Sequence, residues 1–304
     1  MLRDVALSDG FFPGFRALDI DAGNGITIRA RTGGKGPALL LLHGYPQTHV
    51  MWHLVAPKLA EDFTVVVADL RGYGDSSKPP SDMQHLTYSK RAMAADMVAV
   101  MEALGHRRFL LAGHDRGGRV AHRLAIDHPD RVEKIAVLDI APTREMYRNT
   151  TEAFARAYWH WFFLIQPNDF PERMILADTD AYWLRKSTTG SKTVEVFKPE
   201  ALAEYLRCFR DPACVHASCE DYRAGASIDI VHDDEDGNKK LPMPLHVLWG
   251  KKGAIDKCFD ALALWRQRAE HVTGLALPGA HYLAEELPEE TARELKGFFQ
   301  GKAV

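Results

Sequence analysis

Six short runs of aliphatic residues constrain the fold of this 304-residue chain more than any other feature. Two of them, PALLLLHG (37–44) and FTVVVADLRG (63–72), are apolar without interruption instead of alternating with polar residues. This pattern is typical of parallel strands that are covered on both faces. The other four runs are at 107–113, 134–142, 244–250 and 273–281. Because segments with helical spacing, such as 87–105, separate the runs, the sequence predicts an α/β fold with a doubly wound, mostly parallel sheet.

A hairpin and an insertion complete this outline. Near the start, two strand-like segments flank the dipeptide Asn24-Gly25, which is the strongest short-range signal for a tight hairpin turn. Between residues 142 and 230 no strand-like run occurs, and aromatic residues cluster at 158–163. Open α/β sheets bind their ligands at the carboxyl edge of the strands. We therefore expect residues 1–141 and 231–304 to form the core domain and residues 142–230 to form a helical cap (lid) over that edge.

The composition excludes several classes of function. Lysine and arginine total 38 against 41 aspartates and glutamates, and the formal charge of −3 gives no general attraction to nucleic acid or to an anionic membrane. No apolar stretch reaches the roughly 18 residues that a transmembrane helix needs. The N-terminal segment lacks a basic region followed by an apolar one, so the sequence predicts a cytoplasmic location instead of secretion.

The residues that could bind a metal form no convincing motif. The four cysteines, Cys208, Cys214, Cys219 and Cys258, contain no Cys-x-x-Cys pair, and we interpret them as ordinary buried thiols. The acidic segment HDDEDGNKK (232–240) has histidine where a calcium loop needs its first ligand, and we interpret it as a solvated loop. The sequence therefore predicts neither a metal nor a cofactor.

The segment FLLAGHDRGGRVAHRL (109–124) is typical of a strand, a sharp turn and a helix. Turns of this kind carry a nucleophile and need small residues two positions before and after it, where strand and helix approach each other. Gly113 and Gly117 meet that requirement around Asp115, which stands where many hydrolases have serine. A carboxylate is a poor nucleophile toward acyl carbon, but it can displace a leaving group from saturated carbon. Water then hydrolyses the resulting ester at the Asp115 carbonyl, so this residue favours dehalogenation or epoxide opening over esterase activity.

In the order of its motifs the chain resembles the α/β-hydrolase fold superfamily. The motifs are His43-Gly44-Tyr45-Pro46, DLRGYGDSSKP (69–79), the turn at Asp115 and GAHYLAEELPEE (279–290). The resemblance implies an oxyanion hole made by the backbone N–H groups of Tyr45 and Arg116. It also implies that His281, in a Gly-x-His motif, is the base that activates water. The acid that orients this histidine is Asp139 or Asp256, and we favour Asp139 because it ends a neighbouring predicted strand.

Two arginines accompany the predicted nucleophile. Arg116 and Arg119 are three residues apart in the first turn of the predicted helix, so they project on the same side near its positive end. Guanidinium groups pair well with carboxylates. A substrate carboxylate about 4 Å from Asp115 would be repelled by roughly 4 kcal/mol at an effective dielectric constant of about 20, and the arginines would offset this. The alternative is that Arg119 pairs with a surface carboxylate while Arg116 faces solvent.

The pattern Asp-Arg-Gly-x-Arg at 115–119 resembles the fluoroacetate (haloacetate) dehalogenase family. That resemblance implies hydrolysis of haloacetates to glycolate and halide, with both arginines on the substrate carboxylate. It further implies that His160, Trp161 and Tyr222 donate hydrogen bonds to the departing halide. A homodimer and a small anionic 2-halocarboxylate substrate are also implied.

Three other functions stay open on the sequence alone. An epoxide hydrolase or a haloalkane dehalogenase of the same fold would use the same nucleophile. Haloalkane dehalogenases and many epoxide hydrolases, however, carry tryptophan directly after it, where this chain has Arg116, and epoxide opening has no use for paired arginines. A non-catalytic protein that binds a small carboxylic acid would not need both Asp115 and His281. The presence of both residues therefore favours an enzyme.

Overall fold

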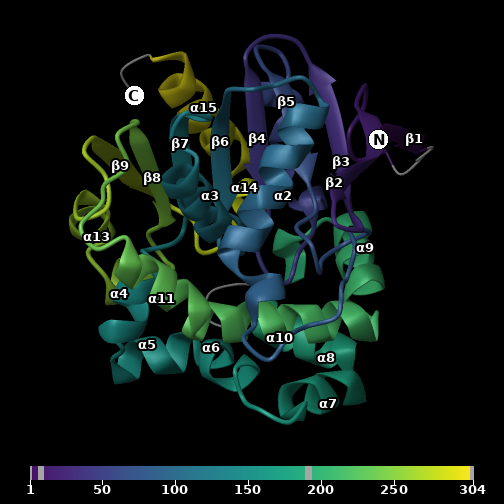
Figure 1. The fold of residues 1–304 in the computed structure, drawn as a ribbon, viewed down its shortest axis with the longest axis vertical. Helices are drawn as coiled ribbons and strands as arrows, with labels where there is room; N and C mark the ends of the chain where they lie inside the picture. Colours follow the sequence, from purple (N-terminus) through teal and green to yellow (C-terminus); the bar gives the residue numbers. More distant parts are fainter. Residues whose placement is uncertain (1, 6–9, 189–193, 302–304) are drawn as a thin grey trace.

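The computed structural model describes residues 2–5, 10–188 and 194–301. Nine strands in these ranges form one sheet in the order β1-β2-β3-β5-β4-β6-β7-β8-β9 (Figure 1). The strands are β1 (Leu2–Val5), β2 (Arg16–Gly23), β3 (Ile26–Gly34), β4 (Ala38–Leu42), β5 (Thr64–Ala68), β6 (Phe109–His114), β7 (Val132–Leu138), β8 (Leu245–Gly250) and β9 (Val272–Leu277). Strands β4 to β9 pair in parallel, while β1, β2 and β3 pair antiparallel with their neighbours. This confirms the predicted doubly wound, mostly parallel sheet.

The strands at the centre of the sheet are those with unbroken aliphatic sequences. β4 lies between β5 and β6, and residues 39–42 are all completely buried. Successive side chains of a strand point to opposite faces, so burial of every one means that both faces are covered. At the edge of the sheet, the hairpin of β2 and β3 turns at Asn24 and Gly25, whose φ angles of 52° and 75° fit the predicted tight turn.

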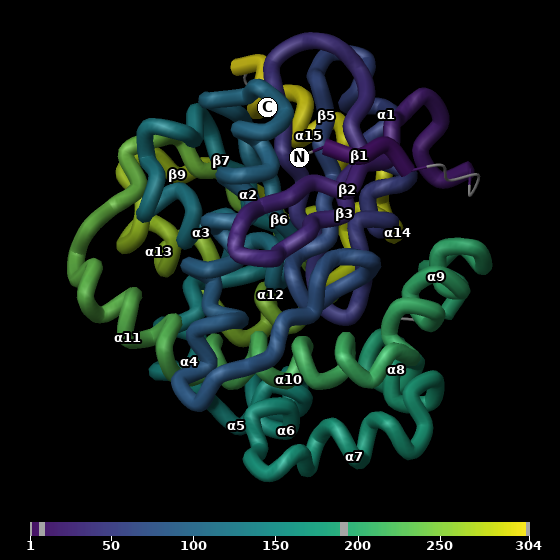
Figure 2. The backbone as a smooth tube through the Cα atoms, turned by 45° about the vertical axis from the view of Figure 1, so that its right-hand side comes forward, coloured from purple at the N-terminus to yellow at the C-terminus, as the bar shows by residue number. Residues whose placement is uncertain are grey.

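Helices cover both faces of the sheet. Figure 2 shows α2 (Lys90–Ala103) and α3 (Arg116–Asp127) on one side of the strands and α1, α14 and α15 on the other. The remaining elements outside the long insertion are η1 (His49–Trp52), α1 (Ala56–Leu59), η2 (Leu86–Tyr88), α12 (Ala254–Cys258), α13 (Ala261–Arg266), α14 (Leu283–Glu286) and α15 (Pro288–Gln300). None of the helices in the described ranges combines the length and the apolar composition needed to cross a membrane.

The helices between β7 and β8 gather at one end of the sheet, below the strands in Figure 1. We call the described residues of this insertion, 143–188 and 194–235, the helical layer. Its elements are α4 (Thr143–Arg148), α5 (Glu152–Ala157), α6 (Trp159–Leu164), α7 (Phe170–Ala177), α8 (Thr179–Ser187), η3 (Val194–Val196), α9 (Pro199–Phe209), α10 (Pro212–Ala226) and α11 (Ile228–Glu235). The ring of Tyr222 on α10 lies 5.2 Å from that of Tyr45, just beyond the carboxyl end of β4. The layer therefore covers the edge where the sequence predicts ligands, while the exact domain boundaries stay a prediction.

The acidic segment 232–240 differs from the sequence interpretation as a solvated loop. Its first four residues belong to α11, and His232 and Asp233 are only 7% and 8% exposed. Arg123 of α3 lies 3.8 Å from Asp233 and forms a second ion pair with Asp236. An arginine of the neighbouring core helix thus compensates the acidic run, and this contact is not visible in the local sequence.

Candidate active site

The predicted nucleophile lies in a strained turn between β6 and α3. Asp115 has φ 48° and ψ −113°, a backbone conformation that residues other than glycine seldom adopt. A Cβ atom on Gly113 would lie 2.4 Å from the carbonyl oxygen of Gly117, and one on Gly117 would lie 2.4 Å from the carbonyl oxygen of His43. Gly113 is therefore needed for β6 and α3 to approach each other as the motif predicts, and Gly117 for α3 to pack against the end of β4.

The Asp115 carboxylate is buried, with 2% exposure, and is held by a backbone group. Its Oδ1 accepts a hydrogen bond of 2.9 Å from the N–H of Tyr45, one of the two predicted oxyanion-hole donors. The other predicted donor, the N–H of Arg116, belongs to the first residue of α3, where backbone N–H groups have no partner within the helix. Burial alone would raise the pKa of the Asp115 carboxyl, but nearby cations, above all Lys186, hold it well below its usual range. Asp115 is therefore ionised.

His281 and Asp139 lie next to Asp115, although each follows a different strand. His281 Nε2 is 3.9 Å from Asp115 Oδ2, and His281 Nδ1 is 2.6 Å from Asp139 Oδ2. The second oxygen of Asp139 accepts a hydrogen bond of 3.0 Å from the backbone N–H of Gly250 at the end of β8. A carboxylate at Nδ1 fixes the tautomer in which Nε2 is the proton acceptor. The three side chains have the geometry of a nucleophile, a base and an orienting acid.

The structure places Asp139, and not Asp256, against His281. Asp256 lies on α12, where it accepts a hydrogen bond of 2.9 Å from Trp249 Nε1 and lies 3.2 Å from Lys251 Nζ. Its side chain is 19% exposed, whereas that of Asp139 is completely buried. The alternative acid considered from the sequence therefore has partners of its own near the surface.

Arg119 is buried beneath the helical layer. Its Nη1 donates to the carbonyl oxygen of Ala141 at 3.1 Å and to the hydroxyl of Thr143 at 2.9 Å. The guanidinium carbon lies 4.6 Å from the centre of the Trp161 ring. Within the described ranges no carboxylate forms an ion pair with this side chain. The alternative of a surface ion pair for Arg119 is therefore wrong.

Arg116 pairs with a carboxylate that the sequence analysis overlooked. Its Nε and Nη2 donate to Asp221 Oδ2 and Oδ1 at 2.9 and 2.7 Å, and both side chains are completely buried. The alternative that Arg116 faces solvent is wrong, and the expectation of two uncompensated cations holds only for Arg119. A signal was present, because Asp221 directly precedes Tyr222 and a buried guanidinium needs a counter-charge.

Asp221 is the centre of a buried ionic network. It also accepts a hydrogen bond from Lys90 Nζ and one of 2.6 Å from the Tyr73 hydroxyl. Lys90 in turn lies 3.2 Å from Asp229. Burial would raise the pKa of Asp221, but Arg116 and Lys90 hold it well below its usual range. Two cations and two carboxylates balance in this network, which therefore adds no net charge to the site.

The three predicted halide donors come from two helices of the layer. His160 and Trp161 belong to α6, and their ring centres lie 5.8 and 6.2 Å from that of Tyr222 on α10. The Arg116 guanidinium carbon is 4.1 Å from the centre of the Tyr222 ring. The structure thus brings the predicted halide donors together beside a predicted carboxylate donor.

At least four buried donors in this region have no acceptor within the described part of the chain. Those four are Arg116 Nη1, Arg119 Nε, Trp161 Nε1 and Tyr222 Oη, which we call the donor cluster. A buried polar group without a partner costs about 1–3 kcal/mol, so each one in a native protein requires an explanation. Three of the four atoms can only donate. A small anion that accepts hydrogen bonds from them would satisfy the cluster.

Lys186 on α8 is a further charge at the site, which the sequence analysis missed. The residue is 6% exposed, and its Nζ donates to the carbonyl oxygen of Tyr45 at 2.8 Å and to the hydroxyl of Tyr282 at 3.3 Å. Of the charges around Asp115, it lowers the pKa of that carboxyl most. No motif or spacing identifies this lysine, because only tertiary packing brings α8 to the end of β4.

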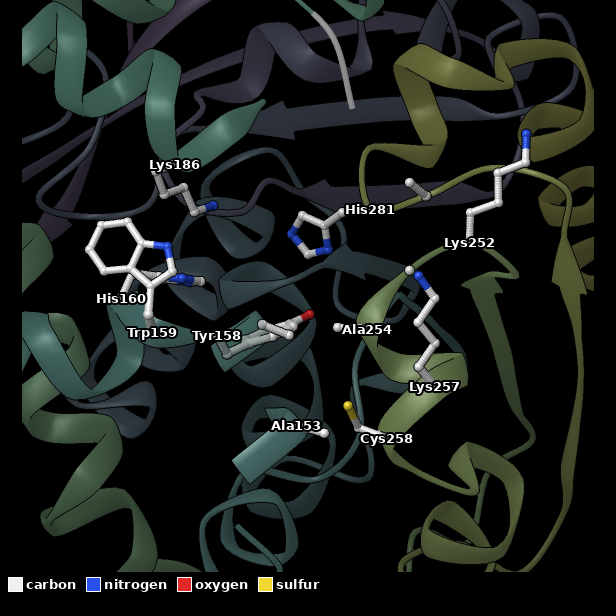
Figure 3. Close-up of a pocket in the computed structure, with 13 residues that line it drawn as sticks. Ala153, Tyr158, Trp159, His160, Lys186, Lys252, Ala254, Lys257, Cys258 and His281 are labelled. Carbon is white, nitrogen blue, oxygen red and sulfur yellow. The ribbon is translucent and has the colours of Figure 1, made fainter. Parts of the chain in front are cut away.

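A cavity of about 240 Å³ leads toward these residues (Figure 3). Its wall includes Tyr158, His160 and Lys186 of the helical layer and His281 of the core. In Figure 3 the rings of Tyr158 and His281 face this space, with α12 on the opposite side. His281 lines the cavity and its Nε2 lies 3.9 Å from Asp115 Oδ2, so the cavity reaches the side chain next to the predicted nucleophile.

One group of possible metal ligands lies away from this site. The ligand atoms of Asp169, Glu172 and His216 are within 4.8 Å of one another. Arg223, however, donates to both oxygens of Glu172, at 2.6 and 3.0 Å. A guanidinium in that position competes with any cation for the carboxylate. The donor cluster is equally unsuited to a metal, because its atoms present hydrogens and not lone pairs.

The chain is similar to known proteins over most of its length. It is 47% identical to a fluoroacetate dehalogenase from Burkholderia sp over 288 residues, which cover 94% of each chain. It is 34% identical to a soluble epoxide hydrolase from Corynebacterium sp. (strain C12) over 270 residues, or 88% of this chain and 91% of the relative. The predicted resemblance is confirmed, and the match to the dehalogenase supports an enzyme that hydrolyses carbon–halide bonds.

A solved structure and a sequence profile agree with these relatives. The crystal structure of a protein from Nostoc sp PCC 7120, assigned to the alpha/beta hydrolases, has a TM-score of 0.91 at 55% identity and covers 94% of this chain and 98% of its own. The profile of the alpha/beta hydrolase fold matches residues 37–286. That range contains the nucleophile turn, the predicted acid and the predicted base, and the chain therefore belongs to the α/β-hydrolase fold family.

Proposed function

We propose that this chain is a haloacetate dehalogenase, which hydrolyses fluoroacetate and chloroacetate to glycolate and halide through an ester of Asp115. The donor cluster carries the proposal, because unpartnered buried donors beside an ionised carboxylate suit a small anionic substrate. The 47% identity to a fluoroacetate dehalogenase supports it. From the family resemblance alone we also propose a cytoplasmic homodimer in which residues 142–230 form the cap.

In the first step Asp115 Oδ2 attacks the α-carbon of the haloacetate. A carbon–oxygen bond forms, the carbon–halogen bond breaks, and the halide leaves with the bonding electrons. Arg116 Nη1 and Arg119 Nε hold the substrate carboxylate, which positions the carbon for attack. Because Oδ1 already accepts a hydrogen bond from Tyr45 N–H, Oδ2 is the oxygen that reacts.

The departing halide is received by His160, Trp161 and Tyr222. Their N–H and O–H groups donate to the atom on which negative charge develops as the bond breaks. Fluoride is the poorest leaving group among the halides, and it also accepts hydrogen bonds most strongly. Donors that point at the leaving atom therefore lower the barrier to carbon–halogen cleavage most for fluoroacetate. Burial raises the pKa of Tyr222 well above its ordinary value, which keeps the phenol protonated and able to donate.

In the second step water attacks Cγ of the Asp115 ester. His281 Nε2 takes a proton from the water, and Asp139 stabilises the imidazolium that forms. Negative charge develops on Oδ1, toward which Tyr45 N–H already donates at 2.9 Å. When the tetrahedral species collapses, the Cγ–Oδ2 bond breaks and glycolate leaves with Oδ2 as its hydroxyl oxygen and the proton from His281. Asp115 keeps the oxygen of the water, and its carboxyl group releases the second proton of the water to solvent, which restores the carboxylate.

The two arginines contribute differently in this mechanism. Asp221 compensates the charge of Arg116, so Arg116 mainly provides a fixed donor. Arg119 has no ion-pair partner within the described ranges, and together with Lys186 it supplies the net positive charge. These two cations offset the repulsion between Asp115 and the substrate carboxylate.

An epoxide hydrolase is the second candidate. The 34% identity to a soluble epoxide hydrolase favours it, and the Tyr222 hydroxyl could donate to an epoxide oxygen. A neutral epoxide, however, would leave Arg119 buried with no anion to bind, and a haloalkane dehalogenase meets the same objection. The contacts among Asp115, His281 and Asp139 argue against a non-catalytic carboxylate-binding protein.

Product measurements on the purified protein test the proposal. Halide release from fluoroacetate and chloroacetate is measured with ion-selective electrodes, and diol formation from styrene oxide by chromatography, for the wild type and Asp115→Ala. We expect the wild type to release halide from both acids and the variant to release none. Turnover of styrene oxide without halide release would overturn the assignment. In a single turnover in ¹⁸O-water, label in the protein supports the ester, and label that enters glycolate directly contradicts it.

A further inference from the structure

The cavity that leads to His281 has an unusual distribution of charge. Thirteen described residues line it, and three of them are lysines, Lys186, Lys252 and Lys257 (Figure 3). None of these thirteen lining residues is an aspartate or a glutamate. For a chain with a formal charge of −3, this is a local excess of positive charge.

The three lysines differ in burial, and we take the two exposed ones to mark the mouth of the cavity. Lys252 and Lys257 are exposed, whereas Lys186 is 6% exposed and lies close to His281 and Asp115. Within the described part of the chain, no carboxylate forms an ion pair with Lys252 or Lys257.

Asp256 is the acid to consider near the mouth. It binds Trp249 Nε1 and lies 3.2 Å from Lys251, and the charge of Lys257 lowers its pKa less than Lys251 does. Lys251 therefore compensates the charge of this carboxylate. The charges of Lys252 and Lys257 can then act on an anion in the cavity.

We propose that Lys252 and Lys257 form an electrostatic access path that draws small carboxylate anions into the cavity, with Lys186 at its inner end. This inference rests on the proposed function, because it adds that the enzyme selects its substrate by charge before the donor cluster is reached. A cleft lined by one sign of charge raises the local concentration of ions of the opposite sign. This increase in local anion concentration becomes smaller as salt screens the charges. The local concentration of a neutral epoxide would not be raised.

Cys258 allows the path to be tested without dehalogenation, because its half-buried thiol lines the same cavity. Cys208, Cys214 and Cys219 are buried. The thiolate displaces iodide from either iodoacetate, which is an anion, or iodoacetamide, which is neutral. Burial raises the pKa of the Cys258 thiol and Lys257 lowers it, but this affects both reagents alike. The ratio of the two alkylation rates therefore isolates the effect of reagent charge.

The alkylation ratio is measured by peptide mass spectrometry at Cys258, in an Asp115→Ala background so that iodoacetate is not consumed. We expect the double substitution Lys252→Gln/Lys257→Gln to lower the ratio of the iodoacetate rate to the iodoacetamide rate roughly threefold to tenfold at low salt. About 0.5 M sodium chloride should remove most of the difference. The control is Lys35→Gln/Lys198→Gln, two exposed lysines outside the cavity. An unchanged ratio, or a loss that persists at high salt, would overturn the inference.

The same double substitution in the active enzyme gives the second measurement. We expect kcat/KM for chloroacetate to fall roughly threefold to tenfold at low salt and to approach the wild-type value at high salt. A salt-independent loss would mean a structural effect and would overturn the inference. If the wild type released no halide while the alkylation ratio behaved as expected, the proposed function would fail and the access path would stand.

Discussion

The carboxyl edge of the sheet and the helical layer build the two halves of the site in different ways. At the sheet, Asp115 and Asp139 directly follow β6 and β7, His281 comes four residues after β9, and the three side chains meet at 3.9 and 2.6 Å. In the layer, the side chains come from separate helices and depend on buried charges such as Asp221. The sheet half therefore rests on backbone geometry and the layer half on electrostatic balance. Substitutions should affect chemistry in the first half, and binding and stability in the second.

The largest effect is expected from His281→Asn in the sheet half. Asp115 can still attack, but water lacks its base, so turnover should fall about 10⁴-fold and the ester should accumulate. Mass spectrometry of the Asp115 peptide after reaction with chloroacetate measures the trapped carboxymethyl group. His271→Asn, at an exposed position, is the matched control. Loss of turnover without any adduct would contradict the two-step scheme.

The next largest effect separates the two acids considered from the sequence. Asp139→Asn removes the charge that stabilises the His281 imidazolium, and kcat should fall roughly 10²- to 10⁴-fold. Asp256→Asn, whose carboxylate contacts Trp249 and Lys251, should change kcat less than about twofold. Steady-state kinetics with chloroacetate measure both. The reverse order of effects would transfer the orienting role to Asp256.

The contrast between the halves also explains what the sequence could predict. The turn at Asp115 could be predicted from Gly113 and Gly117, because such a turn needs small residues two positions before and after the nucleophile, and this pattern spans only five residues. The parallel arrangement of the central strands and the place of Asp139 at the end of one of them follow from the apolar runs, whereas His281 was identified through the family resemblance. The fold and the sheet half of the candidate site were therefore predictable.

The helical layer could be predicted only in outline. His160, Trp161 and Tyr222 were found through a family resemblance, whereas Asp221 and Lys186 were missed. Asp221 lies 105 residues from Arg116 in the chain, so the need of a buried guanidinium for a counter-charge does not by itself identify the acid that supplies it. Each missed residue is an ordinary charged residue on a helix, and its role arises from packing between elements that are distant in sequence.

Asp221→Asn tests the electrostatic balance of the layer and should have an intermediate effect. Arg116 and Lys90 would lose the negative charge between them and one of its two acceptor oxygens, and breaking a buried ion pair typically costs about 3–5 kcal/mol. Arg116 would also lose its fixed orientation, so KM for chloroacetate should rise roughly tenfold, with a smaller change in kcat. Denaturant unfolding and steady-state kinetics measure the two quantities.

The control for this substitution is Asp234→Asn, which removes the same charge from a side chain that is 43% exposed and pairs with Arg148. We expect it to change the free energy of unfolding by less than about 0.5 kcal/mol. If both substitutions left stability and KM unchanged, the buried network would not hold Arg116 in place.

The smallest effect concerns Glu285, which joins the two halves of the molecule. Glu285 on α14 is 6% exposed and accepts a hydrogen bond from the hydroxyl of Tyr205 on α9 of the helical layer. Burial raises the pKa of Glu285 from 4.5 to about 8. Between these values the folded protein binds more protons at this residue than the unfolded chain. The free energy of unfolding therefore falls as pH rises through this range and levels off above about pH 8.

Glu285→Gln removes this titration while keeping a neutral side chain of the same shape at the junction. Between about pH 6 and about pH 9 the free energy of unfolding of the wild type should fall by roughly 1–3 kcal/mol more than that of the variant. At the higher pH the folded wild type must either hold Glu285 protonated or bury its negative charge, whereas glutamine stays neutral. Denaturant unfolding at the two pH values measures this difference. Glu289→Gln, at a side chain that is 72% exposed, should follow the wild type. If Glu285→Gln also followed the wild type, the junction would be open enough to solvate the carboxylate, and the helical layer would be held to the sheet by its other contacts.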